Sequence, residues 1–110
     1  MRRKFEVSSR KENAAYIIAV SGDVDMESSP ELRAEIQRAL KSAKCVKLDL
    51  KAVSYLDSSG VAVLIQGLKW AQKVDVDYRL LDPSSQAKAV IELAQLQQLF
   101  TIDESPGGDE

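Results

Sequence analysis

Three pairs of serines carry the clearest chemical potential in this chain, and each stands where a helix is expected to begin. They occur in SSPE at 28–31, in SSG at 58–60 and in SSQ at 84–86. Serine is favoured just before a helix because its hydroxyl accepts a hydrogen bond from a free amide of the first turn. An exposed serine hydroxyl can also carry a phosphate. The neighbours of each pair indicate which role applies.

The first and third pairs are explained by helix capping. In SSPE a serine caps the helix, Pro30 fixes the first turn and Glu31 complements the helix dipole. In DPSSQ, Asp82 and Pro83 set a turn, and a serine offers the cap.

The middle pair differs because Gly60 falls inside the first helical turn. A glycine there costs about 0.5–1 kcal/mol relative to alanine, so helix formation alone does not favour it. Its use suggests that something approaches the backbone or that a neighbouring side chain must stay exposed. The segment Asp57-Ser58-Ser59-Gly60 would present a hydroxyl and open amides at the positive end of a helix dipole, a setting suited to an anion or to a phosphate on the serine.

The rest of the composition excludes most enzyme chemistry. The chain has no histidine and one cysteine, so neither a Ser-His nor a Cys-His nucleophile can be built and no histidine can bind a metal. The best remaining constellation, Asp23 and Asp25 with Asp57, consists of loop carboxylates that more often cap or face water. We therefore expect no catalytic residue, metal or cofactor, and a protein that is not an enzyme. Cys45, in an apolar run, is expected to be a buried, reduced thiol.

The 110 residues, 45% hydrophobic and 29% charged, fit one small globular domain. The net charge is −2 and no basic patch occurs, which argues against nucleic-acid binding. No signal peptide and no apolar run of about 20 residues is present, so we expect a cytoplasmic protein without direct membrane insertion. Since no coiled-coil repeat or long apolar edge strand stands out, we expect a monomer.

The hydrophobic pattern predicts an α/β fold. Strands are expected over 4–9, 15–21, 44–50 and 74–82, helices over 30–42, 58–73 and 83–95, and loops over 21–30 and 51–57, with a turn at 96–102 that leads into a last short strand. The order β-β-α-β-α-β-α predicts a mixed, largely parallel sheet of four to five strands with three main helices. One domain would span 1–103, and ESPGGDE at 104–110 has the composition of a disordered tail.

The helix that follows Ser58 has two apolar lines. The expected core line is Val61, Leu64, Ile65 and Leu68, and a second line offset by roughly a third of a turn is Val63, Gly67 and Trp70. Either the second line is a contact surface for a partner, or the helix is sandwiched and both lines belong to the core.

Taken together, two segments of the chain resemble a STAS domain of the anti-sigma-factor antagonist type. The resemblance rests on VKLDLKAVSYLDSSGVAVL at 46–64 and on SGDVDMESSPELR at 21–33, and with the order of elements it extends to about residue 102. It implies that Ser58 is phosphorylated by a partner that is both anti-sigma factor and serine kinase. The unphosphorylated form would bind that partner and so regulate transcription, the phosphorylated form would release it, and a phosphatase would reset the switch.

The resemblance also assigns roles around Ser58. Asp25 matches a loop aspartate near the phosphorylated serine, Asp57 would cap or orient, and Ser59 would donate its amide and hydroxyl. The complete expected partner-binding set is Asp25, Asp57, Ser58, Ser59, Gly60, Val63, Gly67 and Trp70.

A second function stays open, because STAS domains also serve as small subunits of a bacterial phospholipid-trafficking ABC transporter, where they dock on the ATPase. The segment VSYLDSSGVAVLIQGL, which runs on to a tryptophan, also resembles such members. The genes nearby would separate the two: a serine kinase and sigma factor, or a permease and ATPase.

Overall fold

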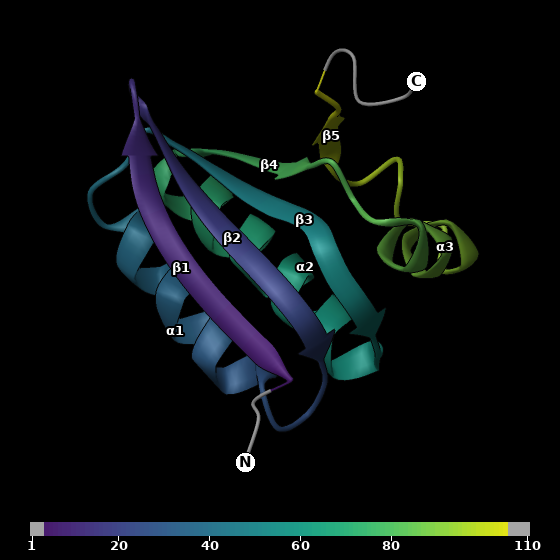
Figure 1. The fold of residues 1–110 in the computed structure, drawn as a ribbon. Helices are drawn as coiled ribbons and strands as arrows, with labels where there is room; N and C mark the ends of the chain where they lie inside the picture. Colours follow the sequence, from purple (N-terminus) through teal and green to yellow (C-terminus); the bar gives the residue numbers. More distant parts are fainter. Residues whose placement is uncertain (1–3, 106–110) are drawn as a thin grey trace.

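The computed structural model describes residues 4–105 as one sheet with three helices (Figure 1). The strands are β1 (Phe5–Glu12), β2 (Ala15–Val24), β3 (Cys45–Leu56), β4 (Asp77–Leu81) and β5 (Thr101–Asp103), and the helices are α1 (Ser29–Leu40), α2 (Ser58–Val74) and α3 (Ser85–Leu93). The strand order in the sheet is β1-β2-β3-β4-β5. β1 is antiparallel to β2, and every later pair is parallel. The predicted fold class and order of elements are confirmed.

Each parallel strand pair is joined through a helix. Figure 1 shows α1 and α2 side by side on one face of the sheet, with α3 next to β3. Since α1 and α2 both return antiparallel to the strands, their N-termini lie together at the carboxyl ends of β2 and β3. That edge is where open α/β sheets place their functional groups.

The first hairpin is longer and tighter than predicted. β1 continues to Glu12, so only Asn13 and Ala14 connect it to β2, in place of the polar turn expected at 10–13. Asn13 has a φ of 59°, a left-handed conformation that asparagine tolerates better than most residues. The polar second half of β1 is exposed, so it lacks the apolar alternation that marks a strand.

The loop predicted over 51–57 is wrong, because β3 extends to Leu56 alongside β2, which itself extends to Val24. Irregularities between Ala19 and Ser21 and between Gly22 and Asp23 shift the register of the pair. Such bulges interrupt the two-residue alternation by which a strand is recognised. Val53 and Leu56 are nonetheless buried, which fixes the end of β3 on the core.

Helix α2 is rotated relative to the prediction. Its buried residues are Gly60, Val63, Leu64, Gly67 and Ala71. Of the expected core line only Leu64 is fully buried, whereas Val61, Ile65 and Leu68 are partly exposed. The reason is the two glycines: with no side chain they let the helix lie close to the sheet, so the face that carries them becomes the inner one.

The C-terminal elements are shorter than expected. β4 begins only at Asp77, because Val74 is the last residue of α2 and is 57% exposed. In α3, Ala87 and Ile91 face inward as predicted, whereas Ala94 lies beyond the helix and is exposed. Of the tail predicted over 104–110, residues 106–110 lie outside the described residues. Within the described part of the chain, no helix has both the length and the apolar character required to cross a membrane.

Candidate functional site

The candidate site lies where the ends of β2 and β3 meet the beginnings of α1 and α2. The two connecting loops are tied together, because the amide of Asp57 donates a hydrogen bond to the carbonyl of Val24 (3.1 Å). Asp25 follows Val24 directly, so the structure brings Asp25 next to the Asp57-Ser58-Ser59 segment. These four residues form the part of the predicted site that the fold assembles.

Asp57 is the N-cap of α2. Its carboxylate Oδ1 accepts hydrogen bonds from the amides of Ser59 (2.9 Å) and Gly60 (3.2 Å). The expected capping role is therefore observed, and it corrects a second expectation. The amides of Ser59 and Gly60 are not open to a ligand, because the Asp57 carboxylate already occupies the position in which an anion would bind.

Ser58 is the first residue of α2 and is exposed. Among the hydrogen bonds between residues 4–105, none involves the Ser58 hydroxyl. The hydroxyl is thus available to another protein, and it stands at the positive end of a 17-residue helix. A negative charge at such a position is stabilised by roughly 0.3–1 kcal/mol.

Gly60 lies beneath this surface rather than on it. A Cβ at Gly60 would stand 2.5 Å from Cδ1 of Leu56, 2.8 Å from Cγ1 of Val24 and 3.0 Å from the Val24 carbonyl oxygen. The close approach that the sequence suggested is therefore made by the protein's own strands. Gly60 itself is buried, so it lies beneath the exposed surface of the expected partner-binding set.

The second apolar line of α2 belongs mainly to the core. Val63 is 2% exposed and Gly67 is buried against Tyr78. The hydroxyl of Tyr78 donates a hydrogen bond to the carbonyl of Leu64 (3.0 Å), in space that a Cβ on Gly67 would occupy. Neither alternative for this line holds in full: Val63 and Gly67 belong to the core, but Val61, Ile65 and Leu68 of the first line are partly exposed, so the helix is not sandwiched.

Trp70 is partly exposed but far from Ser58. The two residues are twelve positions apart in the helix, which corresponds to about 18 Å along the axis of α2. Trp70 lies beside the last turn of α1, with Leu40 and Lys41. The structure therefore does not bring Trp70 into the site at Ser58.

The loop that holds Asp25 is ordered by its own polar groups. The Asp25 carboxylate accepts from the amides of Glu27 and Ser28 (both 3.0 Å). Those bonds, above all the one from the Ser28 amide, lower the pKa of Asp25.

The Ser28 hydroxyl donates to the Asp23 carbonyl (2.8 Å) and accepts from the Asp25 amide (3.0 Å). Ser28 is the N-cap residue of α1 but makes no side-chain capping bond, so the cap predicted for SSPE is corrected: the hydroxyl orders the loop instead. The cap predicted for the third pair is confirmed, since the Ser84 hydroxyl accepts from the Ala87 amide (3.1 Å).

Two exposed apolar side chains at this edge were missed by the sequence analysis. Met26, next to Asp25, is 76% exposed, and Tyr55, near the end of β3, is 51% exposed. Asp23 of β2 pairs with Tyr55 of β3, so Tyr55 lies beside the end of β2, which leads into the loop that carries Met26. A methionine within a run of aspartates and serines was the available signal for Met26, whereas Tyr55 was hidden by the loop wrongly predicted there.

The surface around Ser58 is acidic. Asp25 and Asp57 lie in the two connecting loops and Asp23 lies near the end of β2, and none of the ion pairs between residues 4–105 involves these carboxylates. Asp23 instead accepts a hydrogen bond from the Ser54 hydroxyl (3.0 Å). Across the same described range, no group of three or more histidine, cysteine, aspartate or glutamate side chains is arranged to hold a metal ion.

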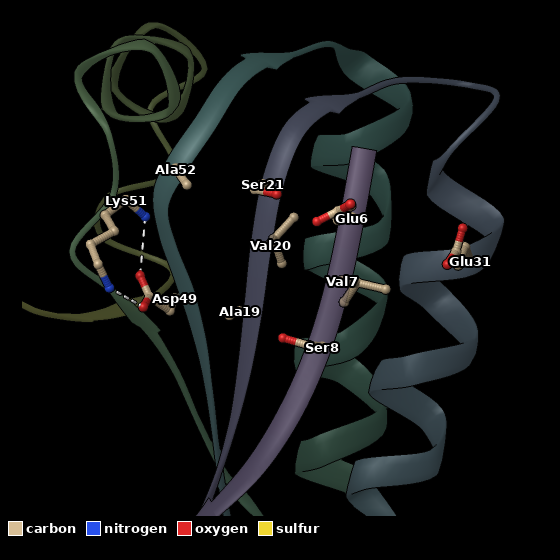
Figure 2. A pocket seen from close by; sticks show the side chains of 10 residues that line it. All are labelled: Glu6, Val7, Ser8, Ala19, Val20, Ser21, Glu31, Asp49, Lys51 and Ala52. Carbon is tan, nitrogen blue, oxygen red and sulfur yellow. Dashed lines mark hydrogen bonds and ion pairs between the residues drawn. The ribbon is translucent and has the colours of Figure 1, made fainter. Parts of the chain in front are cut away.

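A separate hollow of about 410 Å³ lies over β1, β2 and β3. Figure 2 shows Asp49 and Lys51 of β3 paired with one another at its border, with Ser8 and Ser21 on the neighbouring strands. Asp49 is 4% exposed, and the ion pair with Lys51 of the same strand balances its negative charge. None of the predicted site residues lines this hollow.

Comparison with known proteins identifies relatives over nearly the whole chain. The model of the STAS domain family matches residues 6–107. The anti-sigma-B factor antagonist of Bacillus subtilis is 26% identical over 92 residues, which cover 83% of this chain and 84% of the relative.

Solved structures share the fold. An anti-sigma factor antagonist from Mycobacterium paratuberculosis superposes with a TM-score of 0.83 at 23% identity and covers 96% of this chain and 88% of its own. The Bacillus cell fate determinant SpoIIAA in the phosphorylated form superposes with a TM-score of 0.70 at 21% identity and covers 93% of this chain and 92% of its own.

Proposed function

Because this chain belongs to the STAS domain family, we propose that it is an anti-sigma-factor antagonist whose partner binding is switched by phosphorylation of Ser58. The partner is an anti-sigma factor that is also a serine kinase, and it supplies the ATP. The unphosphorylated protein binds this partner and so frees the sigma factor, the phosphorylated protein releases it, and a phosphatase restores the first state. The protein itself acts by binding and carries out no reaction.

The observation that carries the proposal is the state of the Ser58 hydroxyl. It is exposed, makes no hydrogen bond with residues 4–105, and begins a helix of 17 residues. A kinase can therefore reach it without unfolding the helix. Asp57 caps α2 through its own carboxylate, so the helix begins at the same residue whether or not Ser58 carries a phosphate.

The charges around Ser58 explain how the modification would act. A phosphate adds about −1.5 to −2 charges at pH 7, next to the loops that carry the carboxylates of Asp25 and Asp57. A neutral hydroxyl can be buried against a partner at small cost, whereas a dianion must be desolvated and opposes any acidic group on that partner. The attraction between the phosphate and the helix dipole offsets only a fraction of this desolvation and repulsion. Phosphorylation thus weakens the complex and leaves the fold unchanged.

The contact surface that we propose differs in part from the sequence-based set. Asp25, Ser58 and Ser59 lie at the surface, and the exposed Met26 and Tyr55 supply apolar contact area at the same edge. The buried residues Gly60, Val63 and Gly67 act indirectly by holding α2 close to the sheet.

The test begins with mass spectrometry of the protein and its bound partners, isolated from its own cells. We expect phosphate on Ser58 and a serine kinase in the complex. With the purified partner, Ser58→Ala should bind irrespective of ATP, and Ser58→Asp should lose most of its affinity. Ser85→Asp is a matched control, because Ser85 is likewise exposed and is the first residue of α3.

Two results would contradict the proposal. One is equal loss of binding in Ser85→Asp and Ser58→Asp, which would show a general charge effect. The other is an unmodified Ser58 in a complex with an ABC ATPase and a permease. The protein would then be a docking subunit of a lipid transporter.

A further inference from the structure

A second surface lies at the opposite end of α2 from Ser58. The last turns of α1 and α2 enclose a groove of about 210 Å³ lined by Gln37, Leu40, Lys41, Trp70, Lys73 and Val74. Three of the six lining residues are apolar: Leu40 is 8% exposed, Trp70 is partly exposed and Val74 is 57% exposed. α1 and α2 lie side by side on the same face of the sheet, so the groove is formed by two rigid elements (Figure 1).

The rim of this groove is positively charged. Lys41 and Lys73 line it, and neither takes part in an ion pair with any of residues 4–105. Lys69 lies one turn before Lys73 on the same helix and is exposed. Asp75, the nearest carboxylate along α2, does not line the groove.

Helix termini account for part of this charge but not for all of it. Lysines are favoured at helix C-termini, where each helix carries about half a negative charge. Two helix ends therefore contribute about −1, whereas Lys41 and Lys73 contribute two full positive charges. A net positive charge of about one therefore remains beside the apolar lining residues of the groove.

We propose that this groove is a docking site for an acidic, amphipathic segment of a partner protein, which inserts an apolar side chain between Leu40, Trp70 and Val74 and places carboxylates against Lys41 and Lys73. The groove favours a single inserted side chain over a flat membrane surface, since it is a hollow of about 210 Å³ lined by residues of both helices. A second copy of the chain would bring the same lysines to a two-fold interface, where they repel one another.

This surface is independent of the switch at Ser58. The two sites are separated by about 18 Å along α2, and a phosphate at that distance is strongly screened at physiological ionic strength. The groove would hold its partner in both phosphorylation states of the protein. The proposal goes beyond the function of the Ser58 surface and does not rest on it.

Trp70 provides a direct test, because it is the single tryptophan of the chain. The probe is a synthetic acidic peptide with one central leucine flanked by glutamates. Matched peptides carry serine in place of the leucine, or lysines in place of the glutamates. We expect the acidic leucine peptide alone to give a saturable blue shift of the Trp70 emission, with an affinity that falls as salt is added.

The variants locate the effect. Lys41→Gln with Lys73→Gln should weaken binding of the acidic peptide roughly 2- to 30-fold, the range for two exposed ion pairs. Lys11→Gln with Lys88→Gln changes the net charge equally but lies elsewhere, and should leave the affinity unchanged. Ser58→Asp should bind the peptide with the same affinity as the unaltered protein. That last result separates failure of this proposal from failure of the switch.

Several outcomes would overturn the proposal. They are no shift with the acidic leucine peptide, an equal shift with the lysine peptide, and equal weakening in both pairs of lysine variants. An emission shift produced only by vesicles of phosphatidylglycerol would assign the groove to a membrane surface. A shift that depends only on protein concentration would assign it to self-association.

Discussion

Replacement of Gly60 by alanine separates two reasons for a glycine beneath Ser58, namely packing against the strands and space for a partner. If the glycine serves packing, the new Cβ stands 2.5 Å from Leu56 Cδ1, 2.8 Å from Val24 Cγ1 and 3.0 Å from the Val24 carbonyl oxygen. The side-chain atoms can move, but the carbonyl is held, because it accepts the Asp57 amide (3.1 Å). Relief therefore requires that the start of α2 shift away from the end of β2.

Two opposing terms decide how much Gly60→Ala changes the free energy of unfolding. Alanine in place of glycine favours a helix interior by about 1 kcal/mol. Overpacking a filled core costs about 1–3 kcal/mol, and three contacts from two strands place this site in the upper part of that range. We expect Gly60→Ala to lose about 1–2 kcal/mol of the free energy of unfolding, which corresponds to a fall in Tm of roughly 4–10 °C.

Urea denaturation followed by Trp70 fluorescence and circular dichroism measures this loss. Ala62→Gly is the matched control, because Ala62 is exposed in the same helix and its replacement reports the propensity term alone. Leu56→Ala lowers stability by itself, but Gly60→Ala should cost less in the Leu56→Ala background than in the original protein, since the nearest atom is then absent. A Gly60→Ala protein that is more stable than the original and binds its partner less well would refute this reasoning, because the space would then belong to the partner.

Two further predictions concern α2 and the core beneath it. Asp57→Ala should lower the free energy of unfolding by about 1 kcal/mol, because two capping bonds are lost, whereas Asp57→Asn should retain most of it; urea midpoints measure both. Burial raises the pKa of Tyr78 above its usual value of 10.0, so the folded protein keeps this phenol neutral while the unfolded chain releases the proton, and stability should fall as the pH rises above about 10. Tyr78→Phe should show a smaller decline in urea midpoint between about pH 9 and about pH 11, and an equal decline would contradict the assignment.

The sequence sufficed for the order of elements and for the position of Ser58. Both depend on local signals: apolar runs of strand length, helical spacing, and an aspartate with two serines before a glycine. The capping role of Asp57 follows from the same local chemistry. Local chemistry alone did not suffice for Ser28, whose hydroxyl bonds within its loop and does not cap α1.

The rotation of α2 could not be predicted in this way. Counting apolar residues places Val61, Ile65 and Leu68 inward, whereas the structure turns Gly60 and Gly67 toward the sheet. A glycine contributes no hydrophobicity, so its value in allowing two elements to approach is absent from any apolar pattern. That value depends on the strands that the glycines meet, which include Val24 for Gly60 and Tyr78 for Gly67, outside the helix and outside any local pattern.

The end of β3 escaped prediction for a related reason. Its register shifts against β2 break the alternation of buried and exposed residues, so Tyr55 was assigned to a loop. For this reason the exposed side chain of Tyr55, at the end of β3 that leads to Ser58, was not predicted.

The sheet order β1-β2-β3-β4-β5 repeats the order of the strands in the chain, and this has a consequence for biosynthesis. Each strand that leaves the ribosome finds its neighbour already in place, so the sheet can grow from its N-terminal hairpin without waiting for a distant segment. The edge that carries Ser58 is complete once α2 has docked, before β4 and β5 have joined the sheet. A nascent chain could thus form the surface around Ser58 before its last two strands have paired.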